Sequence, residues 1–380
     1  MTKSFQYLIF FLLIIEIRAQ DARFDSLVNS GIKQIYNIKF PKAEQTFRSL
    51  IADYPDHPAG RFFLSMIDWW KILLDFDSEE HDEIFLQKLE DVIFQCDNLL
   101  KKNPENVDAL FFKGGAIGFR GRLRANRKSW LKAADDGRDA LPIVERAANL
   151  KPDNVDVQLG FGIYNYYAEV IPEEYPIIKP LMLFLPSGDK KKGIEQLKNT
   201  AENGKYARYE AQYFLMTLYY NYENNPYRAE EYAETLTKEF PDNPVFQRWR
   251  GRIAAKKGDY FAAASVFQNV IDKMKLGYPG YDVPKTIREA DYYIAYQYFN
   301  TNKLDSAIHY YRDCVKISRR IDKEGESGFQ INSLLYIGMI NDLWGNREAA
   351  ISSYKKILDM DEYGNSHKLA EGYIEKPFKK

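Results

Sequence analysis

The chain has 380 residues, of which 45% are hydrophobic and 28% charged, and its 53 lysines and arginines nearly balance 54 acidic residues. This composition excludes a disordered chain, and a net charge of −1 argues against nucleic acid as the main partner. Two cysteines are too few for a disulfide framework, whereas aromatic residues reach 15%, so large flat side chains must pack somewhere in the fold.

Residues 1–20 form the first predicted element, with Lys3 ahead of an apolar run over 7–15. This order is typical of a secretory signal peptide, and the run is too short to span a bilayer, which takes about 20 apolar residues. We predict cleavage near Ala19 or Gln20 and export to the periplasm or the medium, and no later segment of the sequence is apolar enough to serve as an anchor. The alternative is that the run forms a buried first helix.

From residue 21 onwards, one spacing of small and large apolar residues recurs. Three sets end on a proline: Ala43, Phe47, Leu50 and Pro55; Ala140, Val144, Ala147 and Pro152; Ala229, Ala233, Leu236 and Pro241. Three more keep the spacing without it: Ala263, Phe267 and Val270; Ala307, Tyr311 and Cys314; Ala350, Tyr354 and Ile357. A small residue precedes most of these sets, at Gly31, Gly251, Ala295 and Gly338. Two helix axes approach closely only where Gly or Ala leaves room, so the pattern predicts antiparallel helix pairs.

These sets resemble the tetratricopeptide repeat. We count about eight units, which begin near Phe24, Pro58, Val107, Asn154, Ala207, Val245, Ile287 and Gly328. The resemblance implies an all-α fold, a right-handed superhelical solenoid of antiparallel helix pairs over residues 21–380 with a concave inner surface. The stretch from Val107 to Pro244, with GFGIYNYYAEVIP and PSGDKKKG, further resembles an uncharacterised group of bacterial secreted tetratricopeptide proteins and, more distantly, the tetratricopeptide repeat protein 39 group. That likeness implies helical scaffolding and supplies no catalytic residues.

Two inserts interrupt the first half of the repeat, and inserts of this kind often carry a binding surface. The acidic segment 75–83 would place oxygens on calcium, but it lacks the glycine and terminal glutamate of an EF-hand, which favours a solvated loop. The segment 114–130 lengthens the third unit and gathers basic residues beside an aromatic one: Arg120, Arg122, Arg124 and Trp130. This cluster would grip an acidic peptide or an anionic glycan. The alternative is that the arginines face solvent and pair with nearby acidic residues.

Two more inserts follow. The segment 169–192 comes after a run of tyrosines that includes Tyr164, Tyr166 and Tyr167. It holds an apolar run with Leu181 and Phe184 between four prolines, which forbid a continuous helix. The run is therefore either a plug in the concave groove, which we favour, or a site for a partner or shallow membrane contact. The Gly- and Pro-rich segment 275–286 indicates a loop between units.

No motif for chemistry stands out in the sequence. The four histidines lie in separate units without metal-ligand spacing, and there is no nucleophile elbow and no dinucleotide-binding glycine fingerprint. Cys96 and Cys314 both fall at helix-packing positions, so we predict that each is a small buried residue. We therefore expect no catalytic residue, no cofactor and no metal site.

These observations favour a non-enzymatic scaffold of the bacterial envelope that holds a peptide or a partner subunit in its concave groove. Tyrosines at groove positions would supply amphipathic contact area at low entropy cost: Tyr213, Tyr220, Tyr292 and Tyr296. The alternative is capture of a glycan or small ligand for an envelope transport system, although the five tryptophans are scattered over different units. A hydrolase is the third possibility, and it would need a nucleophile or metal motif that the sequence does not show.

Overall fold

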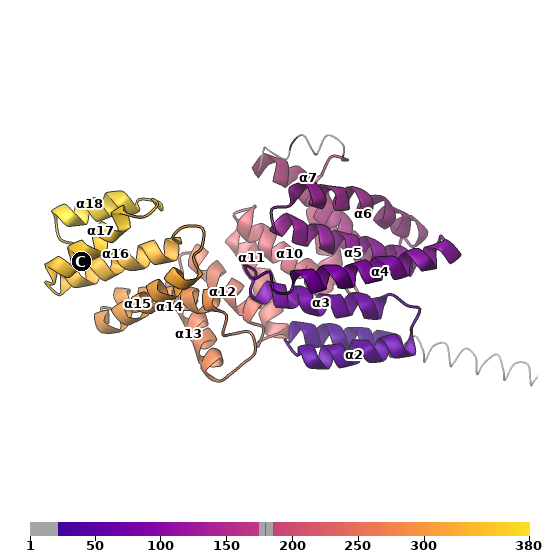
Figure 1. Cartoon of the computed structure of the whole chain (residues 1–380), viewed down its shortest axis with the longest axis horizontal. Coiled ribbons are helices and arrows are strands. Elements are labelled where there is room, and N and C mark those ends of the chain that lie inside the picture. The colour runs from indigo at the N-terminus through magenta and orange to yellow at the C-terminus, as the bar shows by residue number, and fades with distance from the viewer. Residues whose placement is uncertain (1–21, 175–178, 180–184) are drawn as a thin grey trace, which may run out of the picture. The chain divides into compact units, whose positions relative to one another are not determined.

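The structure is a computed structural model, and it describes residues 22–174, 179 and 185–380 (Figure 1). The predicted signal segment, together with Leu181 and Phe184, lies outside the described residues. Every regular element of the described part is a helix, as predicted, and none of these helices is long and apolar enough to cross a membrane. The chain divides after Asn224 into two compact units, which we describe separately.

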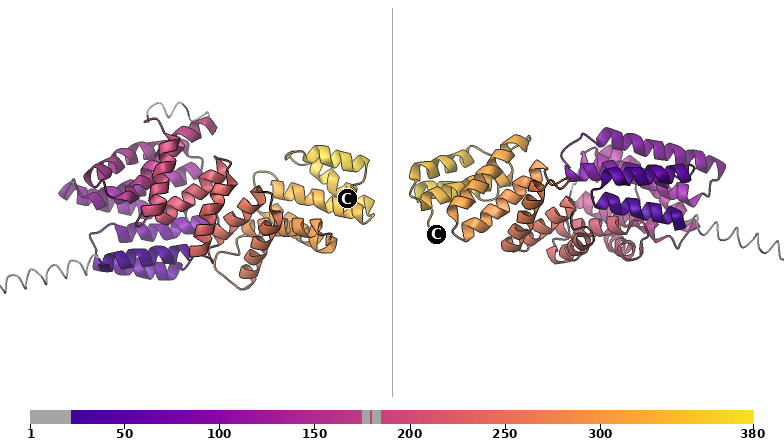
Figure 2. Two further views of the ribbon diagram at one scale, coloured as in Figure 1. Left: turned by 180° about the vertical axis from the view of Figure 1, so that it is seen from behind. Right: turned by 90° about the horizontal axis from the view of Figure 1, so that it is seen from below.

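Unit 1 begins with a helix over residues 22–36 and ends with α10. The elements between them are α2 (Phe40–Asp53), α3 (Ala59–Leu74), α4 (Asp82–Lys102), α5 (Val107–Asn126), α6 (Trp130–Leu150), the 3-10 helix η1 (Val155–Val157), α7 (Gln158–Glu174) and α9 (Lys190–Asn203), and α10 covers Arg208–Asn221. Four helix pairs follow one another, as predicted: the first helix with α2, α3 with α4, α5 with α6, and α7 with α9 (Figure 2).

Unit 2 begins with α11 (Pro226–Glu239). It continues with α12 (Pro244–Lys256), α13 (Tyr260–Lys275), α14 (Pro284–Asn300), α15 (Leu304–Ile321), α16 (Gly328–Leu343), α17 (Arg347–Leu358) and α18 (Ser366–Glu375). Helices α12 to α17 form the last three predicted pairs. The two helices of the predicted fifth pair belong to different units, because α10 lies in unit 1 and α11 in unit 2.

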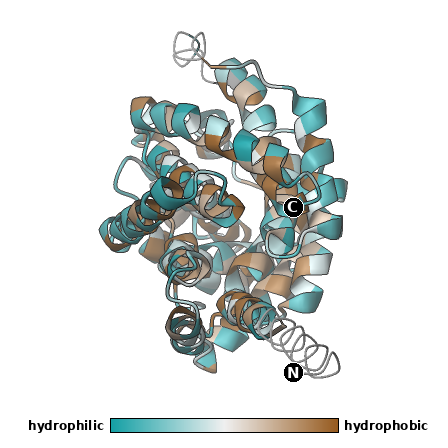
Figure 3. Ribbon diagram, turned by 90° about the vertical axis from the view of Figure 1, so that its right-hand side faces the viewer, coloured by the Kyte–Doolittle hydropathy of each residue, from teal (hydrophilic) through white to brown (hydrophobic). Residues whose placement is uncertain are grey.

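The recurring small residues lie where the helices of a pair cross, as the spacing predicted. Three glycines each face the aromatic residue of their own pair: Gly31 faces Phe47, Gly251 faces Phe267, and Gly338 faces Tyr354. A Cβ atom added at these glycines would lie 2.3, 2.5 and 2.3 Å from a ring carbon, closer than any side chain tolerates. The aromatic rings are fully buried, and Figure 3 shows hydrophilic and hydrophobic residues alternating along the helices. The glycines are therefore required by the close approach of two helices.

The inserts fall at helix ends or extend helices. The segment 114–130 lies mostly within α5, which has 20 residues and pairs with the 21 residues of α6, whereas α2 has 14. The acidic segment 75–83 forms a turn that leads into α4, and 275–286 joins α13 to α14. The described start of the insert 169–192 is the last part of α7, which includes Pro172. Cys96 and Cys314 are free and buried, as expected, and burial raises the pKa of each thiol to about 12.

Candidate functional site

Helix α10 packs against the inner helices of unit 1, where the sequence predicted an open groove. Four contacts join it to four earlier helices: Tyr209 to Tyr36, Tyr213 to Trp70, Phe214 to Arg122, and Phe214 to Tyr167. Tyr213 and Phe214 are 6% and 3% exposed. The inner face of unit 1 is thus filled by the chain's own side chains. Tyr213, which the sequence placed in the groove, belongs to the core of this unit.

An ion pair between Arg122 and Glu210 fixes α10 inside unit 1. Arg122 Nη1 donates to Glu210 Oε1 at 2.6 Å, and the Tyr36 hydroxyl donates to Glu210 Oε2 at 3.2 Å. The guanidinium lies 4.6 Å from the centre of the Trp69 ring and 4.1 Å from that of Phe214. Because its charge is paired and its faces are covered, Arg122 stabilises the interior rather than presenting charge to a partner.

The neighbouring residues Arg120 and Arg124 also form ion pairs within unit 1. Arg120 and Arg124 both donate to the carboxylate of Asp136 on α6, at 2.6 to 3.0 Å, and the Asp136 side chain is only 1% exposed. Arg120 also donates to Glu90 at 2.5 Å. The basic cluster of the sequence is therefore balanced by acidic residues of the same unit, as the alternative predicted, but these arginines are largely buried and do not face solvent.

The predicted tyrosines fall into two groups. Those of α7 are tied to their own unit: Tyr166 is fully buried and donates to Glu223 at 2.6 Å, and Tyr164 donates to the Pro186 carbonyl at 2.7 Å. Trp130, Tyr167 and Tyr220 are half-buried. In unit 2, Tyr292 is half-buried beside Tyr311 and Phe329, and Tyr296 is half-buried with its ring 4.5 Å from Tyr260 and 5.8 Å from Tyr336.

A cavity of about 730 Å³ opens in unit 1 between the starts of the first helix, α5 and η1 and the C-terminal ends of α2, α6 and α9, and we call it the mouth cavity. Its aromatic lining comes from Phe24, Tyr54, Phe111, Phe112 and Tyr206. Its charged or titratable lining comes from Asp25, His57, Asp108, Lys151, Asp153, Asp156 and Lys205. It therefore combines flat apolar faces with charges of both signs, a mixture suited to binding an amphipathic ligand.

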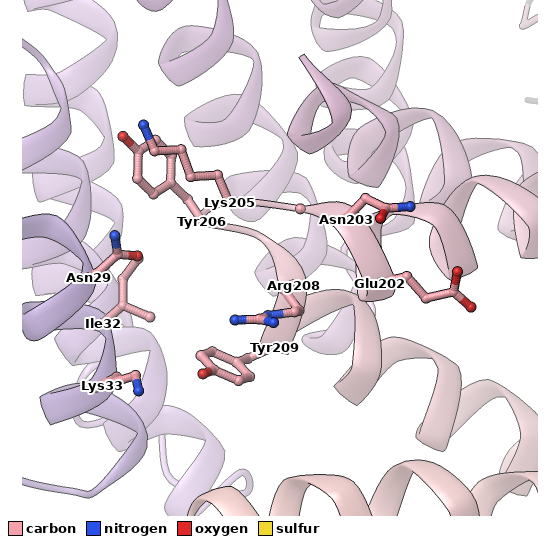
Figure 4. Close-up of a pocket in the computed structure, with 10 residues that line it drawn as sticks. Asn29, Ile32, Lys33, Glu202, Asn203, Lys205, Tyr206, Arg208 and Tyr209 are labelled. Carbon is pink, nitrogen blue, oxygen red and sulfur yellow. The ribbon is translucent and has the colours of Figure 1, made fainter. Parts of the chain in front are cut away.

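A second cavity of about 420 Å³, the seam cavity, shares Asn203, Lys205 and Tyr206 with the first (Figure 4). One wall is the first helix, with Asn29, Ile32 and Lys33, and the other is the turn before α10 together with Arg208 and Tyr209. Figure 4 shows these two walls facing each other across the opening. The loop 203–206 thus separates two adjoining recesses.

Hydrogen bonds hold this loop in place. The Asp156 carboxylate accepts from the backbone N–H groups of Tyr206 and Ala207, each at 3.1 Å. The Tyr206 hydroxyl donates to Asp25 at 2.7 Å, and Lys205 Nζ lies 2.7 Å from the same carboxylate. Burial alone would raise the pKa of Asp25, but the hydrogen bonds from Lys205 and Tyr206 lower it. The walls are preorganised, which reduces the entropy lost on binding.

The mouth cavity has one histidine, His57, which pairs with the carboxylate of Asp108. His57 Nε2 lies 3.6 Å from Asp108 Oδ2, and its ring lies 4.5 Å from that of Phe24. The neighbouring His57 imidazole lowers the pKa of Asp108. The described residues that line this cavity include no serine, threonine or cysteine.

The sequence analysis did not identify the residues around these cavities. Asp25, Tyr206 and Asp156 carry no motif and stand at no repeat position, and the pairs they form are distant in the chain. The local signals are the predicted unit starts near Phe24, Val107, Asn154 and Ala207, and the Asn154 side chain accepts from the Asp156 N–H at such a start.

Comparisons with known proteins find the tetratricopeptide repeat in one part of the chain. Residues 218–273 match a family model of the tetratricopeptide repeat. No curated protein matches the chain significantly. Among solved structures, the C-terminal part of a tetratricopeptide repeat-containing protein from Cytophaga hutchinsonii is 15% identical, with 81% of this chain and 99% of that one covered and a TM-score of 0.38.

Two further solved structures are similar in the same way. A tetratricopeptide repeat protein from Parabacteroides merdae is 12% identical, with coverages of 92% and 98% and a TM-score of 0.29. A signal-transduction ATPase with a tetratricopeptide repeat sensor from Pyrococcus horikoshii is 13% identical, and the match covers 91% of this chain and 48% of that one with a TM-score of 0.48. Because these scores are below 0.5, the assignment depends on the family match and on the helix pairs described above.

Proposed function

We propose that this chain, a tetratricopeptide repeat protein, is a non-enzymatic scaffold of the bacterial envelope that binds a peptide or a segment of a partner subunit. Arrays of this kind present extended surfaces to protein partners. The observation that carries the proposal is the mouth cavity, whose aromatic and charged walls are held by the loop 203–206.

The mouth cavity is the binding surface in this proposal, in place of the predicted concave groove. In unit 1 the groove is filled by α10, so a partner there would have to break the pair between Arg122 and Glu210 and expose rings such as Tyr213. The cavity offers open volume instead, and about 730 Å³ accommodates two or three side chains of an extended segment.

The charge of the lining specifies the kind of segment. Asp25 is already paired with Lys205, and Asp156 is committed to backbone N–H groups. Asp153 and Asp108 are exposed at the rim, and Asp108 also lies 3.6 Å from His57 Nε2. A ligand that carries a basic group would meet these two carboxylates beside the faces of Phe24 and Phe111, where ion pairing and cation–π contact add to apolar burial.

The second candidate function is capture of a glycan or small ligand for an envelope transport system. The size of the mouth cavity favours it, because about 730 Å³ lies within the range of small-molecule sites. Tyr54 and Tyr206 would supply ring faces and hydroxyl groups to a sugar. A glycan array and a peptide array probed with the same labelled chain distinguish the two, since binding to only one of them rejects the other function.

A photo-crosslinking experiment tests the scaffold function. A photoreactive phenylalanine analogue replaces Phe111, which lines the mouth cavity, or Phe94, which is 69% exposed on α4 and lies outside it. The mature chain is irradiated in envelope extract, and adducts are identified by mass spectrometry. We expect one defined adduct at position 111 and none at 94. The same adducts at both positions, or none at either, would reject the mouth cavity as the binding surface.

The envelope location depends on the signal segment. We expect the exported chain to begin near Gln20 or Asp21, and N-terminal sequencing of protein recovered from the envelope or medium checks this. An exported product that begins with Met1, or recovery from the cytosol alone, would remove the location from the proposal and leave the binding surface unaffected.

A further inference from the structure

Residues 376–380 follow α18 and lie across unit 2 in the manner of a bound peptide. Their backbone is extended at Lys376, with φ −131° and ψ 122°. The N–H of Phe378 donates to Asp342 Oδ2 at 2.9 Å, so it bonds to a side chain and continues neither the helix nor a strand. Lys380 Nζ donates to the Phe299 carbonyl at 2.7 Å and lies 4.8 Å from the centre of that ring.

The Phe378 side chain anchors this segment. Its ring lies 5.4 Å from that of Tyr373 and 6.3 Å from that of Phe299, and it packs on the core between α14 and α18. Phe378 is the half-buried residue of the segment, and the other four residues are exposed. Two side chains therefore hold the segment on unit 2, the ring of Phe378 and, two positions later, the ammonium group of Lys380.

The surface that receives the segment is built by other residues. The Asp342 side chain is fully buried, and it accepts from Arg347 Nη1 at 2.8 Å and from the Tyr354 hydroxyl at 2.9 Å. Asp342 is thus fixed by α17, whatever occupies the position of Phe378. The carbonyl of Phe299 lies in the last turn of α14, where the partial negative charge of the helix C-terminus attracts a cation.

We propose that Phe299, Asp342 and Tyr373 form a peptide-binding notch that residues 376–380 occupy within the same chain. Its ligand is an extended peptide with an aromatic residue followed two positions later by lysine or arginine. The backbone N–H of the aromatic residue pairs with Asp342, its ring fills the space beside Tyr373, and the basic side chain reaches the Phe299 carbonyl. This site lies in unit 2 and does not depend on the mouth cavity.

The tail makes the notch selective for strong or abundant partners. A tethered ligand has an effective concentration in the millimolar range when its linker is short. A free peptide with the same contacts must compete with that concentration, so the notch opens to a partner only when the partner binds more tightly or is held nearby. Removing the tail removes this competition.

The probe is a fluorescein-labelled peptide with the sequence of residues 375–380, EKPFKK, measured by fluorescence anisotropy. We expect it to bind a chain truncated after Glu375 at least tenfold more tightly than it binds the full chain. The full-length Phe378→Ala variant keeps the tail but loses its anchor, and we expect intermediate affinity. The same peptide with alanine in place of phenylalanine should not bind the truncated chain.

Circular dichroism of each protein checks that the fold is intact, and the Phe378→Ala variant serves if truncation disturbs it. The proposal would be overturned if the labelled peptide bound the truncated chain and the Phe378→Ala variant no more tightly than the full chain. It would also be overturned if the peptide failed to bind these two proteins while they were folded. Concentration-dependent dimers of the full chain that Phe378→Ala abolishes would assign the notch to exchange of tails between two copies, and would overturn a separate partner peptide.

Discussion

The close approach at Gly338 gives a stability prediction with a matched control. An alanine methyl group at this position in α16 would lie 2.3 Å from Cε1 of the Tyr354 ring. Tyr354 is fully buried and donates to Asp342 at 2.9 Å, so its ring cannot swing away without losing that hydrogen bond. Alanine gains about 1 kcal/mol over glycine in helix propensity. Overpacking of the crossing costs about 1–3 kcal/mol.

Gly372→Ala in α18 is the control, because an added Cβ there meets nothing within 4 Å. Gly372→Ala should therefore gain the helix propensity of alanine without any cost of overpacking. We therefore expect the free energy of unfolding of Gly338→Ala to be lower than that of Gly372→Ala by about 1–3 kcal/mol. Urea unfolding followed by tryptophan fluorescence, to which Trp344 at the C-cap of α16 contributes, measures this difference. With a slope of about 3 kcal/mol per M, the midpoints should differ by about 0.3–1 M.

A second substitution identifies the cause of the loss. In a Tyr354→Leu background the ring that the new methyl group meets is gone, so Gly338→Ala should cost less than in the natural chain. Equal midpoints for Gly338→Ala and Gly372→Ala would refute the assignment of Gly338 to a close helix crossing. An undiminished loss in the Tyr354→Leu background would show that another contact is responsible.

Three further predictions concern buried charges, each measured as the free energy of unfolding in urea. Arg122→Gln leaves the carboxylate of Glu210 buried without its ion-pair partner and should cost about 3–5 kcal/mol. Arg138→Gln breaks an exposed ion pair and should cost less than about 1 kcal/mol. Equal losses of stability in the two variants would contradict the burial argument. Burial would raise the pKa of Glu289, but Arg248 and Arg252 lower it to about 2. The ionised Glu289 should therefore contribute stability on the order of 3 kcal/mol above pH 4.5, and this contribution should be lost as the pH falls toward 2. Glu289→Gln should abolish this pH dependence. Burial raises the pKa of Asp291 to about 7, so the natural chain should lose stability as the pH rises from 3.8 to 7. Asp291→Asn should remove that loss. The same pH profile in the variant and the natural chain would exclude Asp291 as the source of the loss.

The helix pairs were predictable because their packing is local. Gly338 and Tyr354 belong to consecutive helices, so the small residue and the ring that covers it recur at one spacing in the sequence. Each pair repeats the same solution to the same packing problem, and eight weak signals reinforce one another. The positions of the helices therefore followed from the pattern.

The candidate site was not predictable in the same way, because its contacts join distant parts of the chain. Tyr206 donates to Asp25, and Glu210 pairs with Arg122, across the whole of unit 1. Neither pair repeats at any spacing. The basic segment 114–130 looked available for a partner because its acidic counterparts, such as Asp136, are not adjacent in the sequence. Charge visible in a sequence is thus no measure of charge left unpaired in the fold.

One signal in the sequence did point to the enclosure of α10. Its residues RYEAQYFLMTLYYN place apolar or aromatic side chains on every face, and its buried residues run almost continuously from Glu210 to Tyr219. A helix that is hydrophobic all round has no face for solvent and must be surrounded. By contrast, α9 has a polar face and buries only four residues. In a repeat array, such a helix indicates where the inner surface is closed by the chain itself. In the proposed scaffold function, the partner therefore binds where the inner helices end, and in unit 1 the open volume at that place is the mouth cavity.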